Sequence, residues 1–404
     1  MGNVPKLRFP RFSGEWEEKK LNELVSYIKG YAFKSENYGL CGTRIIRVSD
    51  LNENGIKSDN EKVYIKEDFD YQKYLINKNS IVITTVGSHP DMKESAVGRA
   101  IYISDKNIGL LNQNMLMIEE KLNFNNKFLV SLFSKSRYNS FIKSIKRGNA
   151  NQSNITVKEL FAYRIYIPLK QEQEKIASFL SALDKKIEKL EEKIALQEKY
   201  KKAMMQKLFS QEIRFKIDDG SDFPAWEEKK LKEVATINPK TDVLPNEFIY
   251  IDLESVKKGI LVKNEKINLL DAPSRAQRLL SKNDIIYQTV RPYQKNNYLF
   301  DLDGDYVAST GYAQLRAVES SSFLYHLLHT TSFVNNVLLR CTGTSYPAIN
   351  STDLSKIKVD IPSKEEQQKI ANFLSSLDKK IEATKKQKQK ANEFKKGLLQ
   401  QMFV

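Results

Sequence analysis

Cysteine and histidine are the scarcest reactive residues in this chain, which has 404 residues but only two cysteines and three histidines. The thiols Cys41 and Cys341 are too few for a disulfide framework or a thiolate metal site, and they predict a reducing compartment. No run approaches the roughly 20 apolar residues of a membrane helix, and the first ten residues lack the apolar core of a signal peptide. We therefore expect a cytoplasmic protein with no membrane contact.

Motifs that hold a nucleotide or a catalytic metal are also missing. The chain has no G-x-x-x-x-G-K-[ST] loop, no G-x-G-x-x-G turn, no H-E-x-x-H helix and no Asn/Asp-Pro-Pro-aromatic tetrapeptide. His326 and His329 lie in an apolar segment, where a packed helix explains them better than a metal site. Asp301, Asp303 and Asp305 fit a solvated acidic turn better than a Mg²⁺ site. We predict no catalytic residue, no metal site and no cofactor bound by this chain.

The charge balance points to a polyanionic partner. Lys and Arg number 65 against 50 Asp and Glu, which gives a net charge of +15 and a pI near 9.3. Solubility alone requires a net charge of only about 2 to 8 in a small domain. Basic surfaces bind nucleic acid by releasing its counterions, so we expect double-stranded DNA as a partner.

The chain also contains a long internal repeat. IPLKQEQEKIASFLSALDKKIE from Ile167 recurs as IPSKEEQQKIANFLSSLDKKIE from Ile361, 194 residues later, and the same offset relates Phe209 to Phe403. Trp16-Glu17-Glu18-Lys19-Lys20-Leu21 recurs 210 residues later, from Trp226. The segments between these matches share little sequence. Repeated ends around different middles indicate one scaffold that holds two different readers.

The repeated connectors predict two long helices. In each one, apolar residues recur at alternating spacings of four and three, with Lys and Glu between them, which is the pattern of a coiled coil. We expect the two helices to pack against each other in antiparallel orientation. In the second helix, Thr384 and Lys388 weaken the pattern, so its length stays open. The predicted seam comprises Ile176, Leu180, Leu183, Ile187, Leu190, Ile194, Ile370, Leu374, Leu377 and Ile381.

Other apolar residues of these helices are candidates for contacts with partner subunits, although packing within the helix pair explains them equally well. They are Phe179, Leu208, Phe373 and Leu398.

The middles predict an α+β fold with twisted, barrel-like sheets, because short β-branched runs end at Gly, Asn, Asp or Pro. Strands are expected at 43–48, 80–86, 100–104, 164–167, 248–253 and 284–290, and helices at 127–146 and 322–339.

Basic and amide side chains gather in the loops of the middles. Arginine suits guanine and Asn or Gln suits adenine, whereas Lys more often binds phosphate. The candidate DNA-binding residues of the first middle are Lys34, Arg44, Arg47, His89, Lys93, Arg99, Gln113, Asn114, Lys146, Arg147, Asn149, Asn151 and Gln152. Those of the second middle are Arg275, Gln277, Arg278, Gln288, Arg291, Tyr293, Lys295, Arg340, Ser345 and Tyr346.

Several motifs resemble those of the DNA specificity subunit of type I restriction-modification enzymes. They are PKLRFPRFSGEW from Pro5, GYAFKS from Gly30, the doubled EQ-x-KIA-x-FL-x-x-LD core, and PSRAQR, TVRP and STGY in the second middle. The resemblance covers essentially the whole chain. It implies target recognition domains at residues 1–166 and 212–360, a central helix at 167–211 and a C-terminal helix at 361–404.

The resemblance also implies a function. Each recognition domain would read one half of a bipartite, asymmetric DNA sequence, and the helices would fix the spacing between the halves. Two modification subunits, which use S-adenosylmethionine to methylate adenine, would bind the helices. Two restriction subunits, which use ATP and Mg²⁺ to translocate and cleave DNA, would join through them.

Two other functions remain open from the sequence. One is a stand-alone Mg²⁺-dependent nuclease that uses unrecognised carboxylates. The other is a coiled-coil scaffold with no role in reading DNA.

Overall fold

The computed structural model describes residues 3–52, 55–57, 61–66, 71–105, 108–120, 124–149, 152–241, 243–343 and 345–404. These residues form two compact units, each assembled from segments far apart in sequence. Unit 1 contains residues 1–191 together with 387–404, and unit 2 contains residues 192–386. Each unit therefore receives one half of each long helix. No described helix combines the length and apolar character that a bilayer crossing requires.

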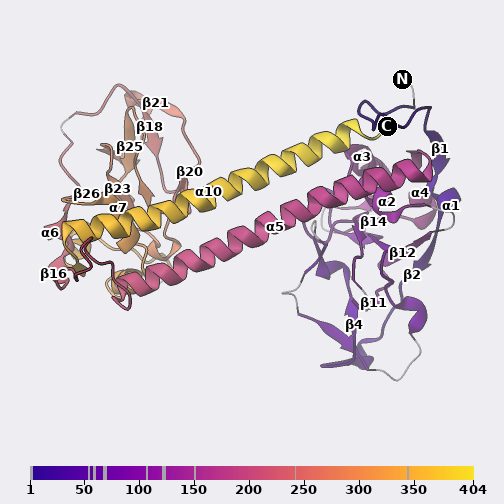
Figure 1. The fold of residues 1–404 in the computed structure, drawn as a ribbon, viewed down its shortest axis with the longest axis horizontal. Coiled ribbons are helices and arrows are strands. Elements are labelled where there is room, and N and C mark those ends of the chain that lie inside the picture. Colours follow the sequence, from indigo (N-terminus) through magenta and orange to yellow (C-terminus); the bar gives the residue numbers. More distant parts are fainter. Residues whose placement is uncertain are drawn as a thin grey trace. The chain divides into compact units, whose positions relative to one another are not determined.

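Unit 1 contains two four-stranded sheets (Figure 1). One has the order β10-β8-β12-β2 and is antiparallel throughout. The other has the order β11-β4-β7-β3 and pairs β11 with β4 in parallel. The strands of these sheets are β2 (Val25–Lys29), β3 (Tyr38–Gly39), β4 (Thr43–Ile46), β7 (Val63–Ile65), β8 (Ile81–Thr84), β10 (Ala100–Tyr102), β11 (Leu110–Leu111) and β12 (Met115–Glu120).

Unit 2 repeats the antiparallel sheet and one parallel strand pair of unit 1, although its middle shares little sequence with unit 1. Its second sheet has a different order, β21-β18-β25-β22, because β22 pairs with β25 whereas β3 of unit 1 pairs with β7. The antiparallel sheet β24-β23-β26-β17 has the same chain order as β10-β8-β12-β2. In the second sheet, β25 pairs with β18 in parallel, as β11 pairs with β4. The strands are β17 (Ala235–Ile237), β18 (Glu247–Ile251), β21 (Lys266–Asn268), β22 (Ala276–Leu279), β23 (Ile285–Gln288), β24 (Tyr298–Leu299), β25 (Tyr306–Ser309) and β26 (Tyr312–Ala317).

Smaller elements complete the two units. Unit 1 has the hairpin β5 (Leu51–Asn52) with β6 (Gly55–Ile56), the strands β9 (Val86–Gly87), β13 (Arg147–Gly148) and β14 (Ser153–Asn154), and the helices α1 (Leu21–Leu24), η1 (Ser35–Asn37), η2 (Val48–Asp50), η3 (Gln72–Tyr74) and α4 (Val157–Phe161). Unit 2 has the hairpin β19 (Val256–Lys257) with β20 (Ile260–Leu261), and the helices α6 (Leu231–Val234), η4 (Leu269–Asp271), η5 (Pro292–Gln294) and α9 (Ser351–Ser355).

The α+β class and all six expected strands are confirmed, but each of the two expected helices of the middles is a pair of shorter helices. The first is divided into α2 (Asn126–Phe133) and α3 (Ser136–Ile145) by Lys135, which has an extended backbone. The second is divided into α7 (Ser321–Leu327) and α8 (Thr331–Leu338). There the Thr330 side chain accepts a hydrogen bond from the Phe333 amide and caps a new helix. The apolar pattern alone conceals these breaks.

The repeated sequence ends form the same contacts in both units. β1 (Glu17–Lys20) pairs with β15 (Arg164–Ile167), and β16 (Glu227–Lys230) pairs with β27 (Lys358–Ile361) in the matching register. Each pair precedes one of the long helices, which are α5 (Lys170–Phe209) and α10 (Lys364–Gln401). α10 therefore continues through Thr384 and Lys388, and its 38 residues settle the length that the sequence left open.

The two long helices run antiparallel within each unit (Figure 1). In unit 1, Asp184 and Glu191 of α5 form ion pairs with Lys395 and Lys388 of α10. In unit 2, Glu198 and Lys201 of α5 pair with Lys385 and Asp378 of α10. Residue numbers rise along one helix as those of their partners fall along the other, which confirms the predicted orientation.

Each unit has its own large apolar core, and the helix seam contributes to both. Ile176 and Leu180 are buried in unit 1, and Ile370 and Leu374 are buried in unit 2. Leu183 and Leu377 are partly buried against the same cores. Between these turns, Ile187, Leu190 and Ile194 are half-buried, whereas Ile381 is buried. The ends of the predicted seam therefore pack against the cores of the two units as well as against the neighbouring helix.

Candidate nucleic-acid interface

In unit 1, two stretches of the chain that are distant in sequence meet just beyond the central strand β8. β9 pairs with β14, which pairs with β13. This small sheet brings the expected residues Arg147, Asn149 and Gln152 beside the loop that follows β9. The side chain of Asn149 accepts a hydrogen bond from the Gln152 amide at 2.9 Å and so shapes the turn. Asn151, also expected here, lies outside the described residues.

The loop after β9 carries two further expected residues, His89 and Lys93, of which Lys93 is exposed. The loop is attached to α3, because Asp91 accepts hydrogen bonds from Asn139 at 3.0 Å and pairs with Lys143 at 2.8 Å. The contact with Lys143 holds the pKa of Asp91 below its usual value. His89 lies 3.6 Å from the same carboxylate, so Asp91 holds the loop beside two basic side chains.

Other expected residues of unit 1 have more varied surroundings. Lys34 is exposed and pairs with Glu36 at 3.5 Å. Lys146 is half-buried at the end of α3, and Arg147 is exposed but pairs with Glu159 at 2.7 Å. The Arg99 side chain donates a hydrogen bond to the Met92 carbonyl at 2.5 Å, so it holds the loop after β9 in place.

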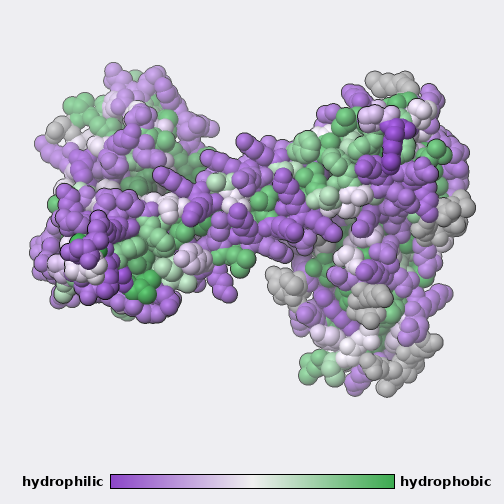
Figure 2. All heavy atoms as spheres, viewed as in Figure 1, coloured by the Kyte–Doolittle hydropathy of each residue, from purple (hydrophilic) through white to green (hydrophobic). Residues whose placement is uncertain are grey.

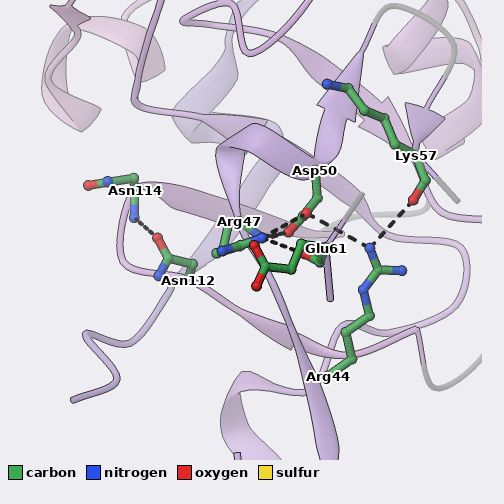
Figure 3. Close-up of polar contacts among 7 residues, drawn as sticks. All are labelled: Arg44, Arg47, Asp50, Lys57, Glu61, Asn112 and Asn114. Atoms are coloured by element: carbon green, nitrogen blue, oxygen red, sulfur yellow. Dashed lines mark hydrogen bonds and ion pairs between the residues drawn. The ribbon is translucent and has the colours of Figure 1, made fainter. Parts of the chain in front are cut away.

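Arg44 and Arg47 were expected to contact DNA, but the structure directs both inward. Figure 3 shows their side chains converging on Asp50, whose carboxylate is buried. Arg47 donates to Asp50 at 3.3 Å and to the Glu61 carbonyl at 2.7 Å. Arg44 lies 3.9 Å from Asp50 and donates to the Lys57 carbonyl at 3.4 Å. A buried carboxylate needs such partners, so these arginines stabilise the fold of unit 1.

The amides Gln113 and Asn114 are also half-buried in a turn rather than displayed. The Asn114 amide N–H donates to the Asn112 side chain at 3.4 Å (Figure 3), and the Asn114 carbonyl accepts from the Thr85 amide at 2.8 Å. These two residues connect β12 to the end of β8 and hold the base of the candidate surface.

Unit 2 builds the same junction with different side chains. Thr289, like Thr85, accepts a backbone hydrogen bond from an isoleucine: Ile349 in unit 2 and Ile155 in unit 1. Val290 bridges to Ala348, and Thr342 bridges to Ala348 from the other side. The expected residues Arg291, Tyr293, Arg340, Ser345 and Tyr346 come from these segments, and all but the half-buried Arg291 are exposed.

A second group of expected residues in unit 2 lies in the segment that contains β22. Arg275 and Gln277 are exposed, and Gln277 donates to the Ser274 carbonyl at 2.8 Å. The Thr310 amide donates to the Arg275 carbonyl at 2.9 Å. This segment is therefore attached to the turn between β25 and β26.

Three other expected residues of unit 2 make internal contacts. Arg278 donates to the Tyr312 carbonyl at 3.0 Å, and Lys295 donates to the His329 carbonyl at 2.8 Å. Burial lowers the pKa of both side chains. Gln288 is only 3% exposed and donates to the Val290 carbonyl at 2.7 Å. Sequence alone does not distinguish these side chains from their exposed neighbours.

The histidines of unit 2 are packed, as expected. His326 lies in the last turn of α7 and His329 lies two residues beyond it. Burial lowers their pKa values to about 3 and about 4. His329 contacts the Tyr325 carbonyl through Nδ1 at 2.7 Å. Among the described residues, no group of three or more His, Cys, Asp and Glu side chains is arranged to hold a metal ion.

Of the four apolar residues considered for partner contacts, Leu208 and Leu398 are buried in the cores of units 2 and 1. Phe179 is 37% exposed and packs edge-on against Phe9. Phe373 packs on Phe215 in the matching way. Core packing, the alternative that the sequence left open, therefore explains the two leucines.

The helices also carry an exposed aromatic pair that is absent from the expected residues. Tyr200 of α5 is 51% exposed and Phe394 of α10 is 57% exposed. The two residues are 194 positions apart, so they occupy the same place in the repeat. Figure 2 shows a mostly hydrophilic surface along the middle of the long helices. The repeat offset was the signal that would have identified this pair.

Known proteins share both the sequence and the fold of this chain. The sequence profile of the type I restriction modification DNA specificity domain matches residues 13–198 and 225–393. The MjaVIII specificity subunit of Methanocaldococcus jannaschii is 26% identical, over 98% of this chain and 94% of its own length. The HindI specificity subunit of Haemophilus influenzae is 31% identical over 40% of this chain and 34% of its own length.

The solved structures extend the likeness to the fold. The type I restriction-modification S subunit of M. genitalium superposes with a TM-score of 0.63 at 19% identity, covering 99% of each chain. With both of its repeats matched by the profile, the chain belongs to the family of type I restriction-modification DNA specificity subunits.

Proposed function

We propose that each unit reads one half of a bipartite DNA sequence and that the paired helices set the distance between the halves. The observation that carries this proposal is the repeated junction beyond β8 and β23, where one topology presents two different sets of side chains. Two copies of one reader would carry the same side chains and read a symmetric site. The recognition domains of this proposal span residues 1–166 and 212–360, joined by helices at 167–211 and 361–404.

The proposed contact surface of each unit is the expected set without the residues that make internal contacts; His89, Lys146 and Arg291 are half-buried and the others are exposed. In unit 1 it comprises Lys34, His89, Lys93, Lys146, Arg147, Asn149 and Gln152. In unit 2 it comprises Arg275, Gln277, Arg291, Tyr293, Arg340, Ser345 and Tyr346. Arg, Asn and Gln supply base contacts, and the lysines bind phosphates. Arg44, Arg47, Arg99, Gln113, Asn114, Arg278, Gln288 and Lys295 support these surfaces from within.

The proposed partners of the chain are two modification subunits that methylate adenine with S-adenosylmethionine. Tyr200 and Phe394 support this number, because the repeat presents the same exposed aromatic residue twice, once in each unit. Two restriction subunits that use ATP and Mg²⁺ complete the assembly. Membership in the specificity-subunit family assigns this chain to recognition, which argues against a stand-alone nuclease and against a scaffold with no role in reading DNA.

Methylome sequencing of a host that expresses the chain with its modification subunits tests this proposal. We expect methylated adenines only within one asymmetric, two-part sequence with a fixed gap. Replacing residues 24–166 with another reader should change one half of that sequence and leave the other half intact. Methylation at unrelated sites, or simultaneous change of both halves, would overturn the proposal.

A nuclease assay addresses the alternative directly. The purified chain is incubated with plasmid and Mg²⁺ in the absence of other subunits, and no cleavage is expected. Binding of the assembled methyltransferase complex to DNA should weaken steeply with added salt, because phosphate contacts release counterions.

A further inference from the structure

Arg291 has a backbone conformation that is uncommon for a residue with a side chain. It follows Val290 at the end of the central segment and has φ 53° and ψ 56°, in the left-handed region. The left-handed conformation is less favourable for an L-residue than its usual conformations, because the Cβ atom crowds the following carbonyl oxygen. Arg291 also precedes Pro292, which restricts its backbone further. Strained residues of this kind persist where the surrounding structure holds them, and they concentrate at functional sites.

The loop around Arg291 is fixed by several hydrogen bonds. The Arg291 amide donates to the Pro347 carbonyl at 2.7 Å, and the Gln294 amide donates to the Arg291 carbonyl at 3.0 Å. The buried Gln288 side chain donates to the Val290 carbonyl and, at 3.0 Å, to the Gln294 side chain. A ligand that binds here does not need to order this backbone first, which preserves binding free energy.

The Arg291 side chain is stacked rather than paired. Its guanidinium carbon lies 4.1 Å from the centre of the Tyr346 ring, and Tyr346 is 64% exposed. Within the described part of the chain, the guanidinium has no hydrogen-bond acceptor and no carboxylate partner. Stacking on one face leaves the N–H groups at the edge free, and these groups form the planar fork that binds two acceptors at once.

Unit 1 has no counterpart of this arginine. Gly87 occupies the matching place, two residues after Thr85 as Arg291 is two residues after Thr289. A Cβ atom at Gly87 would lie 2.1 Å from the Ser95 carbonyl oxygen, so unit 1 has no room for a side chain at this position. Both units would meet the same DNA backbone, so an arginine that binds phosphate would be equally useful in both. An arginine present only in unit 2 is better explained by the base sequence, which is the part of the target that differs between the two half-sites.

We propose that Arg291, held by Tyr346, reads a guanine in the half-site bound by unit 2. Guanine offers two acceptors, O6 and N7, at the major-groove edge, and the guanidinium fork matches them. Adenine places an N–H donor where guanine has O6, and the guanidinium has only donors, so adenine is rejected. This inference rests on the proposed function, because it requires unit 2 to read a half-site.

Four variants of the assembled methyltransferase complex test the inference. Arg291→Gly suits the left-handed backbone and removes the fork, so it should fold and lose the preference for guanine at one position of one half-site by about 5- to 150-fold. Arg291→Lys retains the charge but lacks the fork, and should lose the same preference while retaining affinity. Tyr346→Ala should weaken the preference, whereas Tyr346→Phe keeps the ring and should preserve it.

The readout is base preference at every position, obtained by methylating genomic DNA in vitro and sequencing it. A half-site of unit 2 without guanine, or an Arg291→Gly complex that keeps every preference, overturns this inference and leaves the proposed function intact. A uniform loss of affinity over all sequences identifies a phosphate contact and also overturns it. Wild-type complex that shows no preference at all overturns the proposed function itself.

Discussion

Asp184 on α5 and Lys395 on α10 form an ion pair of 2.5 Å in unit 1, and the residues related to them by the repeat form the same pair in unit 2. The second pair joins Asp378 on α10 to Lys201 on α5, also at 2.5 Å. Each aspartate and each lysine is 194 positions from its counterpart. The repeat therefore encodes a contact that each unit forms once, with the two helices exchanging roles.

These pairs are expected to set helix register more than stability. The side chains of Asp184 and Lys395 are 51% and 31% exposed, and such pairs contribute at most about 1 kcal/mol. Asp184→Lys should destabilise unit 1 by up to about that amount, since two lysines then face each other. The double variant Asp184→Lys, Lys395→Asp should recover the loss. Urea denaturation of the wild type, Asp184→Lys, Lys395→Asp and the double variant measures the coupling free energy between the two side chains. If the losses of the two single variants simply add in the double variant, the assigned register is contradicted.

The buried ion pairs at the start of the helices should matter much more. Arg8 donates to Glu172 through two nitrogens at 2.7 Å, and Glu172 is only 1% exposed. Arg8→Ala would leave a buried carboxylate without its partner, which costs about 3 to 5 kcal/mol. Arg214→Ala should have a comparable effect in unit 2, because Arg214 binds the fully buried Glu366 in the same way.

A matched control for this prediction is Arg164→Ala. Arg164 pairs with Glu18 at 2.8 Å, but its side chain is 59% exposed. Chemical denaturation should show no measurable loss for this variant. Equal losses for Arg8→Ala and Arg164→Ala would show that burial of Glu172 does not decide the energetics.

Local pattern predicted the scaffold of this protein but not the environment of its loop residues. The heptads of α5 and α10 were readable because their period is fixed, and the repeat implied that the helices are partners. The divergent middles concealed their common topology, because β-sheet pairing depends on contacts distant in sequence. Arg44 and Arg291 illustrate the limit. Arg44 lies within β4 and Arg291 follows β23, yet only the fold places Asp50 beside one and Tyr346 beside the other.

His326 of α7 and His329, two residues beyond its end, predict an acid-sensitive unit 2. The pKa values of His326 and His329 are lowered to about 3 and about 4, whereas unfolded histidine titrates near 6.5. The unfolded chain therefore binds more protons below pH 6.5, so the free energy of unfolding must fall as the pH falls. Between pH 7 and pH 5 each histidine should cost about 2 kcal/mol.

Urea denaturation at these two pH values measures the effect in the wild-type chain and in His329→Gln. The variant should lose about half of the pH dependence. A free energy of unfolding that does not change between pH 7 and pH 5 would show that the histidines are accessible to protons in the folded state.

The exposed aromatic residues of the helices should bind the modification subunits. Tyr200→Ala and Phe394→Ala each remove one of the two repeated rings, so each variant should bind one modification subunit normally and the other weakly. The double variant should bind neither tightly. Mass measurement of the assembled complex distinguishes these outcomes, and Leu196→Ala, which removes an exposed residue without a repeated apolar counterpart, is the control. Full binding by the double variant would exclude this pair as the docking site.

The length of the helices should determine the gap between the two half-sites. Seven residues of helix rise about 10.5 Å, which corresponds to about three base pairs at 3.4 Å each. Because α5 and α10 pair antiparallel in both units, a heptad must be inserted in each helix: after Glu191 in α5 and after Lys386 in α10. Insertion in α5 alone would lengthen only one helix between the ion pairs Asp184–Lys395 and Lys201–Asp378. The two ion pairs could then no longer form together, so we expect this insertion to destabilise the helix pair.

Single-molecule sequencing of methylated DNA measures the gap. A gap that grows by about three base pairs with unchanged half-sites confirms that the helices act as the ruler, whereas an unchanged gap in the folded double insertion would show that the spacing is set elsewhere.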